Sequence, residues 1–215
     1  MGFGSEFDSQ NIASYGDIAL VDFSLLGCDT TTTILTDKTE LKEHLQHFLS
    51  DGIKHKRFWN TDIKQPGYNF SISNISASYF IQILKEIDQK LQKQQQCATA
   101  LDHIFKDEKL FLTHNYSQNS SGTHLYYPII LNPELQCPKE DIYKELLSKG
   151  IDVEVFYKPI YQYSCFEKRH LNVTNDFYRS ILLLPLKEKD TSSSTTMAQD
   201  FLDIIHNYNF RGCSF

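Results

Sequence analysis

The second half of the sequence alternates short apolar runs with helical patterns, and this alternation limits the chain to a layered α/β fold. "HLYYPIIL" at 124–131 and "ILLL" at 181–184 have the apolar, β-branched and aromatic composition of strands. Segments 139–148 and 194–208 place apolar residues at helical spacing. Such elements bury their apolar faces by packing helices onto a sheet. We therefore predict a small α/β domain with an antiparallel sheet.

Turn residues at the segment ends complete the expected elements of this half. The predicted strands are 110–116, 124–131, 151–157 and 181–184, and the predicted helices are 98–105, 139–148, a short turn at 175–179, and 194–208. We expect the sheet core to come from Tyr126, Ile129, Leu131, Val153, Val155, Leu182 and Leu184, covered by Ile142, Leu146, Phe201, Ile204 and Ile205.

The first half has a different organisation. Strands are predicted at 17–25 and 31–36, a helix at 39–50 closed by Gly52, a loop at 59–70, and a helix at 73–96 with Ser73 as its N-cap. The glutamine and lysine tract that ends this last helix favours a hinge. Two domains are therefore predicted, 1–89 and 90–215.

The charge, the apolar runs and the cysteine spacing of the chain limit the classes of partner and site that it can have. The chain has 215 residues, a net charge of −6 and a pI near 5.7, which argue against a nucleic-acid or membrane partner. No apolar run reaches the roughly 18 residues of a membrane span and no signal-peptide pattern is present, so a cytoplasmic protein is expected. The five cysteines lie far apart without a CxxC pair, so neither a metal site nor a disulfide framework is predicted.

Three ordered motifs carry a family resemblance. They are "GYNFSISNISA" at 67–77, "HLYYPIIL" at 124–131 and "GIDVEVFYKPIYQY" at 150–163. Together they resemble the DegT/StrS family of sugar-nucleotide aminotransferases, and in particular members that act on a UDP-linked 4-keto sugar. The resemblance implies pyridoxal phosphate (PLP) as cofactor, glutamate as amino donor and a homodimer. It covers the C-terminal half of a fold-type I PLP-transferase: 1–89 as a remnant of the large PLP-binding domain, and 90–215 as the small domain.

The start of the chain fits the same resemblance. The segment "GFGSEFDSQNIASYGDIALVDFS" is similar to the family stretch that precedes the catalytic turn, so we interpret these residues as native sequence that begins within a domain. After Ser24, the family has the form S-x-x-x-x-K-x-x-T-T-x-E-G-G, in which the lysine forms the Schiff base with PLP. Here Asp29 stands at the lysine position, Thr32 and Thr33 keep the paired threonines, and E-G-G is missing. No lysine occurs between Met1 and Asp37.

Other family positions have also changed. The family motif Y-N-Y-R reads Tyr68-Asn69-Phe70-Ser71, which keeps the asparagine that reaches the partner subunit's cofactor phosphate and loses the arginine. The motif H-Y-K-P reads Phe156-Tyr157-Lys158-Pro159, which loses an imidazole near the substrate. The resemblance therefore implies vestigial cofactor contacts at Ser24 and Asn69 and vestigial substrate contacts at Tyr157 and Lys158.

Each of these residues also has a purely structural interpretation. Ser24 and Asn69 are ordinary turn residues, Asp29 suits a loop, and Tyr157 and Lys158 could simply end an edge strand. Isolated histidines such as those at positions 44, 47, 114 and 124 fit solvated or core roles better than metal ligation.

Two functions compete. The first is a truncated or degenerate aminotransferase homologue that is inactive alone; the second is a working subunit whose lysine-bearing half comes from another chain. A lysine-independent relative, in which histidine replaces the lysine, ranks last because Asp29 is a poor base beside a cationic ring. Either main alternative leaves sheet edges and apolar surface exposed, which predicts self-association or binding to an N-terminal fragment.

Overall fold

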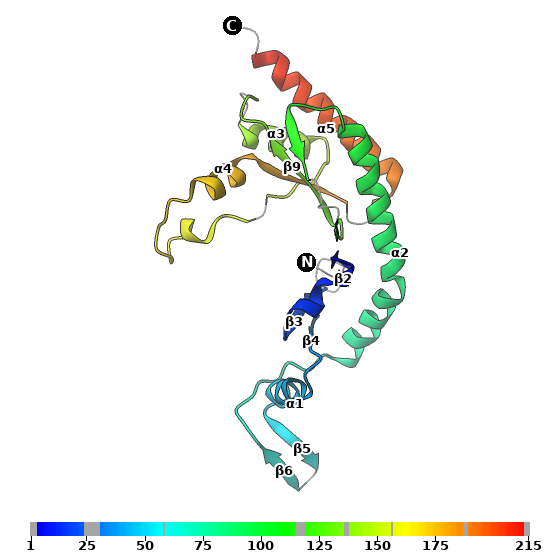
Figure 1. Cartoon of the computed structure of the whole chain (residues 1–215), viewed down its shortest axis with the longest axis vertical. Coiled ribbons are helices and arrows are strands. Elements are labelled where there is room, and N and C mark those ends of the chain that lie inside the picture. The colour runs from blue at the N-terminus through cyan, green and yellow to red at the C-terminus, as the bar shows by residue number, and fades with distance from the viewer. Residues whose placement is uncertain are drawn as a thin grey trace. The chain divides into compact units, whose positions relative to one another are not determined.

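A computed structural model describes residues 4–23, 31–57, 59–114, 119–135, 138–155, 157–186 and 189–212 (Figure 1). The chain divides into two compact units, one formed by 1–88 with 118–123 and the other by 89–117 with 124–215. No helix of the described ranges has the length and apolarity needed to cross a bilayer.

The first unit is built from small antiparallel sheets and two helices. Its elements are β1 (Glu6–Phe7), β2 (Gln10–Asn11), η1 (Ile12–Tyr15), β3 (Ala19–Asp22), β4 (Thr32–Leu35), α1 (Thr39–Phe48), β5 (Ile53–Arg57), β6 (Asn60–Ile63), the first part of α2 (Asn74–Phe105) and β8 (Ser120–Ser121). Strands β2, β1 and β8 form one sheet, and β3–β4 and β5–β6 are two-stranded pairs. Within the described residues, β3 and β4 confirm the strands predicted at 17–25 and 31–36, and the two strands are paired, with Leu20 opposite Ile34.

The loop predicted at 59–70 is partly wrong, because its first residues form β6. Arg57 pairs with Asn60 and Ile53 with Ile63, with an irregularity after Ile53. All four β6 residues are exposed, so neither face shows the apolar alternation by which a strand is recognised in a sequence. The β2–β1–β8 sheet was also not predicted. Its two-residue strands are too short to give a pattern.

Helix α2 is one continuous helix of 32 residues, whereas the sequence predicted a break near residue 97. The segment contains no Gly or Pro, and its Gln, Lys and Ala residues have high helix propensity, so nothing interrupts the hydrogen-bonded ladder. The predicted N-cap is confirmed, because the Ser76 amide donates to Ser73 Oγ at 3.1 Å. One helix therefore contributes residues to both units.

The second unit is an antiparallel sheet covered by helices. Its elements are the remainder of α2, β7 (Phe111–Thr113), β9 (Tyr126–Leu131), α3 (Lys139–Ser148), η3 (Ile160–Gln162), α4 (Asn172–Ser180), β10 (Ile181–Pro185) and α5 (Thr191–Gly212). The strand order is β10–β9–β7 and both pairings are antiparallel, which confirms the predicted sheet (Figure 1). Residues from α2, α3 and α5 pack on the sheet's buried face.

The predicted core is confirmed with one change of face. On β9, Tyr127, Ile129 and Leu131 are buried, while Tyr126 lies on the opposite face and is only half-buried. The side-chain period of two excludes Tyr126 from the set that contains Ile129 and Leu131. Val155 is only partly buried against the core.

The strand predicted at 151–157 is reduced to a single bridge between Glu154 and Leu183. The Glu154 amide donates to the Leu183 carbonyl and the Leu183 amide donates to the Glu154 carbonyl, both at 3.0 Å. Immediately before the bridge, the Val153 amide donates to the Ile151 carbonyl, which turns the chain instead of extending it. Gly150, with φ of +76°, reverses the direction of the chain after α3 as expected for a helix C-terminus.

Glu108 links three elements at one end of the second unit. Its Oε1 accepts the Lys109 and Leu110 amides at 2.7 and 3.0 Å, and its Oε2 lies 2.8 Å from His206 Nε2 on α5. Burial raises the pKa of Glu108, but these hydrogen bonds outweigh it and hold the pKa below its usual value. The carboxylate therefore fixes the start of β7 against the last helix.

Truncation of a core residue should destabilise the second unit. Leu184 is fully buried on β10, so Leu184→Ala should cost about 2–5 kcal/mol of unfolding free energy. Leu112 on β7, at the other edge of the same sheet, is 64% exposed, and Leu112→Ala should stay within about 0.5 kcal/mol of the unchanged chain. Urea unfolding followed by circular dichroism measures both. Equal midpoints for the two variants would contradict the assigned sheet face.

His124 is a buried titratable group in the second unit. It precedes β9 and exposes 6% of its surface. Burial lowers the pKa of His124; the charge of Asp102 opposes this effect and that of His114 adds to it. Asp102 itself accepts a 2.6 Å hydrogen bond from the Tyr127 hydroxyl, so this carboxylate is already engaged. The folded chain therefore favours neutral His124.

Stability should fall as His124 is forced to protonate. The unfolded histidine has a pKa of about 6.5, and the folded pKa lies lower, so stability is complete above this value and declines as pH falls below it. We expect a lower melting temperature at about pH 5.5 than at about pH 7.5. Both pH values lie above the range in which Glu108 takes up a proton, because its pKa is lowered, so Glu108 does not contribute to the difference. His124→Gln should flatten this dependence and His103→Gln, on an exposed helix position, should keep it. An unchanged slope in His124→Gln would refute the assignment.

Candidate functional site

Asn69 lies in a loop that is fixed by backbone hydrogen bonds to the end of α1. The Tyr68 amide donates to the Phe48 carbonyl at 2.7 Å and the Phe70 amide to the Leu49 carbonyl at 3.1 Å. The Asp51 amide donates to the Tyr68 carbonyl at 3.1 Å, and Asn69 forms an antiparallel bridge with Ser50. The position of Asn69 is therefore set by the main chain of its neighbours.

Two glycines allow this close approach. A Cβ at Gly67 would lie 2.2 Å from the Gly52 nitrogen and 2.8 Å from the Phe48 carbonyl oxygen. A Cβ at Gly52 would lie 1.7 Å from the Gln65 carbonyl oxygen, and Gly52 also has φ of +75°. Only glycine fits at either position, so the two residues specify how the loop docks.

The Asn69 side chain is exposed and its oxygen is used locally. Oδ1 accepts bonds from both the amide and the hydroxyl of Ser71. No bond from Nδ2 to any described residue is recorded, so this amide nitrogen is the atom available to an external acceptor. The arrangement agrees with both interpretations of Asn69: it is a turn residue that still presents one donor.

A hollow of about 600 Å³ lies beside this loop within the first unit. Its lining, which we call the β4–α2 hollow, consists of Thr31, Thr32, Thr33, Ile34, Leu49, Phe70, Ser71, Ile72, Ser73, Ser76, Ala77, Phe80 and Ile81. The paired threonines and the residues that follow Asn69 thus face the same space. The described lining residues are of types that do not titrate near neutral pH, so they offer the hollow hydroxyl and apolar contacts.

Tyr157 and Lys158 lie in an exposed segment of the second unit. Tyr157 is 75% exposed, and Lys158 Nζ lies 5.2 Å from the centroid of the Tyr163 ring. The segment continues into η3, which α4 holds through Asn175: Asn175 Oδ1 accepts the Tyr161 hydroxyl at 2.8 Å and Gln162 Nε2 at 2.9 Å. Asn175 therefore positions this segment. No local sequence pattern indicates that role, because both donors come from residues more than ten positions away.

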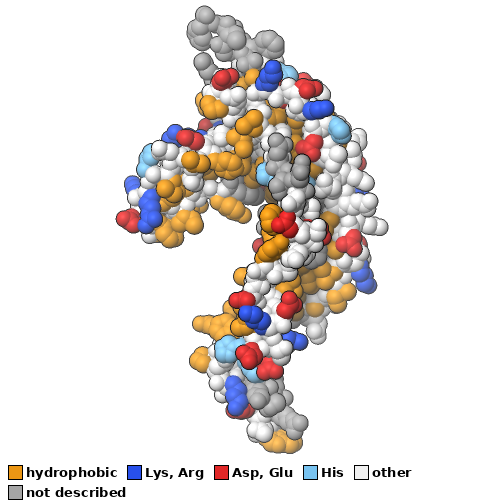
Figure 2. Space-filling view, in the orientation of Figure 1, with side chains coloured by type: hydrophobic (Ala, Val, Ile, Leu, Met, Phe, Trp, Pro, Cys, Tyr) orange, Lys and Arg blue, Asp and Glu red, His pale blue; other side chains and the backbone are white. Residues whose placement is uncertain are grey.

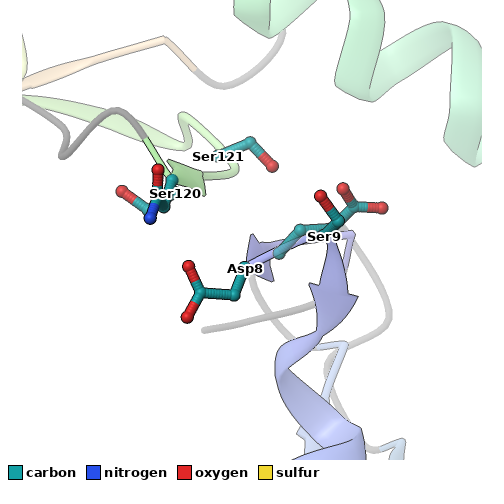
Figure 3. A pocket seen from close by; sticks show the side chains of 6 residues that line it. Asp8, Ser9, Ser120 and Ser121 are labelled. Carbon is teal, nitrogen blue, oxygen red and sulfur yellow. The ribbon is translucent and has the colours of Figure 1, made fainter.

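A second, polar hollow of about 450 Å³ lies beside β1 and β8 (Figure 3). It is lined by Glu6, Asp8, Ser9, Asn119, Ser120 and Ser121. Asp8 and Ser9 form the turn between β1 and β2 with positive φ at both residues, as a two-residue hairpin of the primed type requires. Among the residues described, no set of acidic, histidine and cysteine side chains is arranged to hold a metal ion.

Three residues singled out from the sequence lie outside the described ranges: Ser24, Asp29 and Phe156. Of the others, Asn69 belongs to the first unit and Tyr157 and Lys158 to the second. The predicted roles of all these residues remain predictions.

Comparison with known proteins identifies the family. Residues 1–198 match the DegT/DnrJ/EryC1/StrS aminotransferase family. The chain belongs to this family. Among curated members, it is 29% identical over 206 residues to a UDP-4-amino-4,6-dideoxy-N-acetyl-beta-L-altrosamine transaminase of Campylobacter jejuni, covering 93% of this chain and 55% of that protein. The corresponding transaminase of Helicobacter pylori is 30% identical over 190 residues, covering 85% and 50%.

Solved structures of the family share the fold. Helicobacter pylori PseC, an aminotransferase involved in the biosynthesis of pseudoaminic acid, superimposes with a TM-score of 0.88 at 26% identity, over 95% of this chain and 57% of PseC. The PLP form of the putative sugar aminotransferase Spr1654 from Streptococcus pneumoniae gives 0.82 at 18% identity, over 95% and 56%. The chain thus spans about half the length of the family members it matches.

The described residues do not by themselves fit PLP. A family aminotransferase binds this cofactor through a lysine amine, and no amine is among the described residues that line the β4–α2 hollow, which include both paired threonines. Asn69 and the hydroxyls could bind a phosphate oxygen but could not form an imine. We therefore assign no reaction step to PLP on this chain.

Replacing Gly67 should detach the Asn69 loop. In Gly67→Ala the new methyl group meets main-chain atoms, which cannot move as a flexible side chain would, so we expect a cost of about 1–3 kcal/mol. Amide hydrogen exchange of Tyr68 and Phe70 should accelerate. Gly150→Ala, where the Cβ meets nothing within 4 Å, strains only the second unit and should leave these two amides protected. Unchanged protection in Gly67→Ala would show that the loop docks differently.

Proposed function

We propose that this chain is a truncated or degenerate sugar-nucleotide aminotransferase homologue that does not transfer an amino group by itself. The observation that carries the proposal is the sequence from Met1 to Asp37, which contains no lysine and places Asp29 at the position of the Schiff-base lysine. A carboxylate forms no imine, and its negative charge opposes that of the cofactor phosphate. The missing E-G-G and the change of H-Y-K-P to "FYKP" support the same conclusion.

The domain assignment follows from the proposal. Residues 1–89 would be what remains of the large PLP-binding domain, and residues 90–215 the small domain, so that the chain represents the C-terminal half of a family member. The lengths of the curated relatives, of which about half is matched, support this assignment. Ser24 and Asn69 would be vestigial cofactor contacts, and Tyr157 and Lys158 vestigial contacts to a UDP-linked sugar, in a cytoplasmic protein.

Assembly is part of the same proposal. We expect a homodimer, or association with an N-terminal fragment, because the first turns of α2 carry apolar side chains on the surface. Ile75, Tyr79 and Ile81 are 84%, 57% and 54% exposed, whereas Ile83 and Ile87 on the same helix are buried. The apolar side chains of this helix are therefore divided: the later ones pack inside the chain and the first ones remain for a partner.

The direct test is whether the chain forms a Schiff base. The purified chain is mixed with PLP, reduced with borohydride and digested, and any PLP adduct is located by mass spectrometry. We expect no stoichiometric adduct, no imine absorbance and no amino transfer from glutamate to a UDP-4-keto sugar. Asp29→Lys restores the amine at the family position and should gain an adduct there. The Helicobacter pylori transaminase serves as the positive control.

The same experiment addresses the alternative, a working subunit whose lysine is supplied by another chain. This alternative is favoured by the retained Asn69 loop and by the exposed α2 surface. It predicts amino transfer only after a lysine-bearing N-terminal fragment is added, with the adduct on that fragment. Turnover by the unmixed chain, together with an adduct on one of its own lysines, would disprove both proposals.

A further inference from the structure

The residues between Pro159 and Ile181 form an arm of the second unit that core packing does not hold. Pro159 and Ile181 are buried, but η3 and α4, which lie between them and are described throughout, contain no buried residue. Ile160, Phe166 and Phe177 are 65%, 54% and 47% exposed. Figures 1 and 2 show the arm at the left of the view, with hydrophobic side chains exposed beside lysine and arginine. The position of the arm between its two ends therefore depends on contacts other than core burial.

Helix α4 has few features that would stabilise it by itself. It has nine residues, no side-chain hydrogen bond at its N-cap and no acidic residue in its first turn. A helix this short is marginal without tertiary contacts, because its few hydrogen bonds hardly repay the cost of nucleation. The carbonyls of a last helical turn lack partners within the helix and carry partial negative charge. A cation at the C-terminal end of α4 would therefore stabilise the helix and fix its position.

Lys139, the first residue of α3, places its ammonium group at this end of α4. Its Nζ donates to the Tyr178 carbonyl in the last turn of α4 and lies 4.6 Å from the centroid of the Tyr178 ring. Lys139 stands at the N-terminus of its own helix, where the helix dipole disfavours a positive charge. Burial lowers the pKa of Lys139, and the charge of Glu140 opposes this effect. The carbonyl and the ring of Tyr178 are the contacts that offset these costs.

Helix α4 in turn holds η3 and the residues beside it. Asn175 Oδ1 accepts the hydrogen bonds from Tyr161 and Gln162 of η3. Tyr163 follows η3, and its ring carries Lys158 Nζ at 5.2 Å from the centroid. The contacts thus run from α3 through α4 and η3 to Lys158, which the family resemblance implies as a substrate contact.

We infer that Lys139 is a positioning residue, which caps α4 and thereby fixes where the arm presents Lys158. Loss of its positive charge releases α4 and, through Asn175, releases η3 as well. Only the functional meaning of Lys158 rests on the proposed function. The placement of the arm is independent of amino transfer and of sugar binding.

Hydrogen exchange of the full chain, followed by mass spectrometry, tests this inference without any ligand. In Lys139→Gln we expect the amides of α4 and of η3 to exchange about tenfold faster, because a hydrogen bond from a charged donor is lost. The Gln162 amide, which donates to the Pro159 carbonyl at 2.8 Å, reports on η3. Exchange in β9 should stay unchanged and shows that the unit remains folded.

Two further variants separate the positive charge from other effects on α3. Lys139→Arg keeps a cation that can donate to a carbonyl and stack on a ring, so it should restore most of the protection. Lys144→Gln removes the same charge from an exposed position of α3, where Lys144 pairs with Asp141 at 3.2 Å. It should leave exchange in α4 and η3 within about twofold of the unchanged chain.

The order of the contacts is tested on α4 itself. Asn175→Ala removes the acceptor for η3 but not the contact with Lys139, and alanine favours helix more than asparagine does. Exchange should therefore accelerate in η3 while α4 stays protected. Tyr178→Leu keeps the carbonyl and removes the ring, so α4 should exchange faster, though less so than in Lys139→Gln.

A spectroscopic signal follows the effect to Lys158. Its side-chain protons lie over the Tyr163 ring, which shifts their NMR resonances. These resonances should move toward random-coil positions in Lys139→Gln and in Asn175→Ala, and should stay in place in Lys144→Gln. A contribution of Lys139 to the stability of α3 alone would leave them unchanged.

Several results would overturn the inference. They are unchanged α4 exchange in Lys139→Gln, equal acceleration in Lys144→Gln, equal effects of Lys139→Arg and Lys139→Gln, or faster α4 exchange in Asn175→Ala. If Lys139→Gln also unfolds β9, the other α4 variants decide: unchanged η3 in Asn175→Ala or unchanged α4 in Tyr178→Leu contradicts the inference. A PLP adduct in the Schiff-base experiment would disprove the proposed function and leave this assignment standing.

Discussion

Phe105, Phe111 and Phe201 meet edge to face in the second unit, with ring centroids 5.1 to 6.0 Å apart. They come from α2, β7 and α5, so this contact joins a helix, an edge strand and the last helix over one face of the sheet. Edge-to-face pairs add favourable electrostatics to a large buried area. The remainder of the core, including Leu182, Leu184 and Ile142, packs around this cluster.

How much of this fold the sequence could predict depends on how strongly each segment is buried. The strands at 126–131 and 181–185 carry apolar residues on a buried face, and both strands and the antiparallel character of their sheet were predicted correctly. By contrast, β6 is exposed throughout and β1, β2 and β8 have two residues each, so their side chains carry no period. The break predicted in α2 failed because a low-complexity composition was interpreted as a boundary, although every residue in it favours helix.

The candidate site shows the same division between local and distant information. Ser73 and Gly52 were recognised from the sequence because capping and helix termination are local. The contact between Gly52 and Gly67 and the two hydrogen bonds received by Asn175 join residues far apart in the sequence, and no local pattern encodes them. Family membership was predictable because three motifs keep their order, and residues 1–198 confirm it. The roles of Ser24, Asp29, Asn69, Tyr157 and Lys158 concern chemistry that motif order does not decide.

The unbroken α2 helix has a consequence for how this chain can vary. The tract "QKLQKQQQ" at 89–96 has the repetitive polar composition of a spacer. Here it lies between Ile83 and Ile87, which are buried before it, and Cys97, Ala98, Leu101 and Phe105, which are buried after it. One added glutamine would rotate every later side chain by about 100° about the helix axis. A tract that looks like a spacer is therefore part of the helix register, because its length sets the angle about the helix axis between the side chains buried before it and those buried after it.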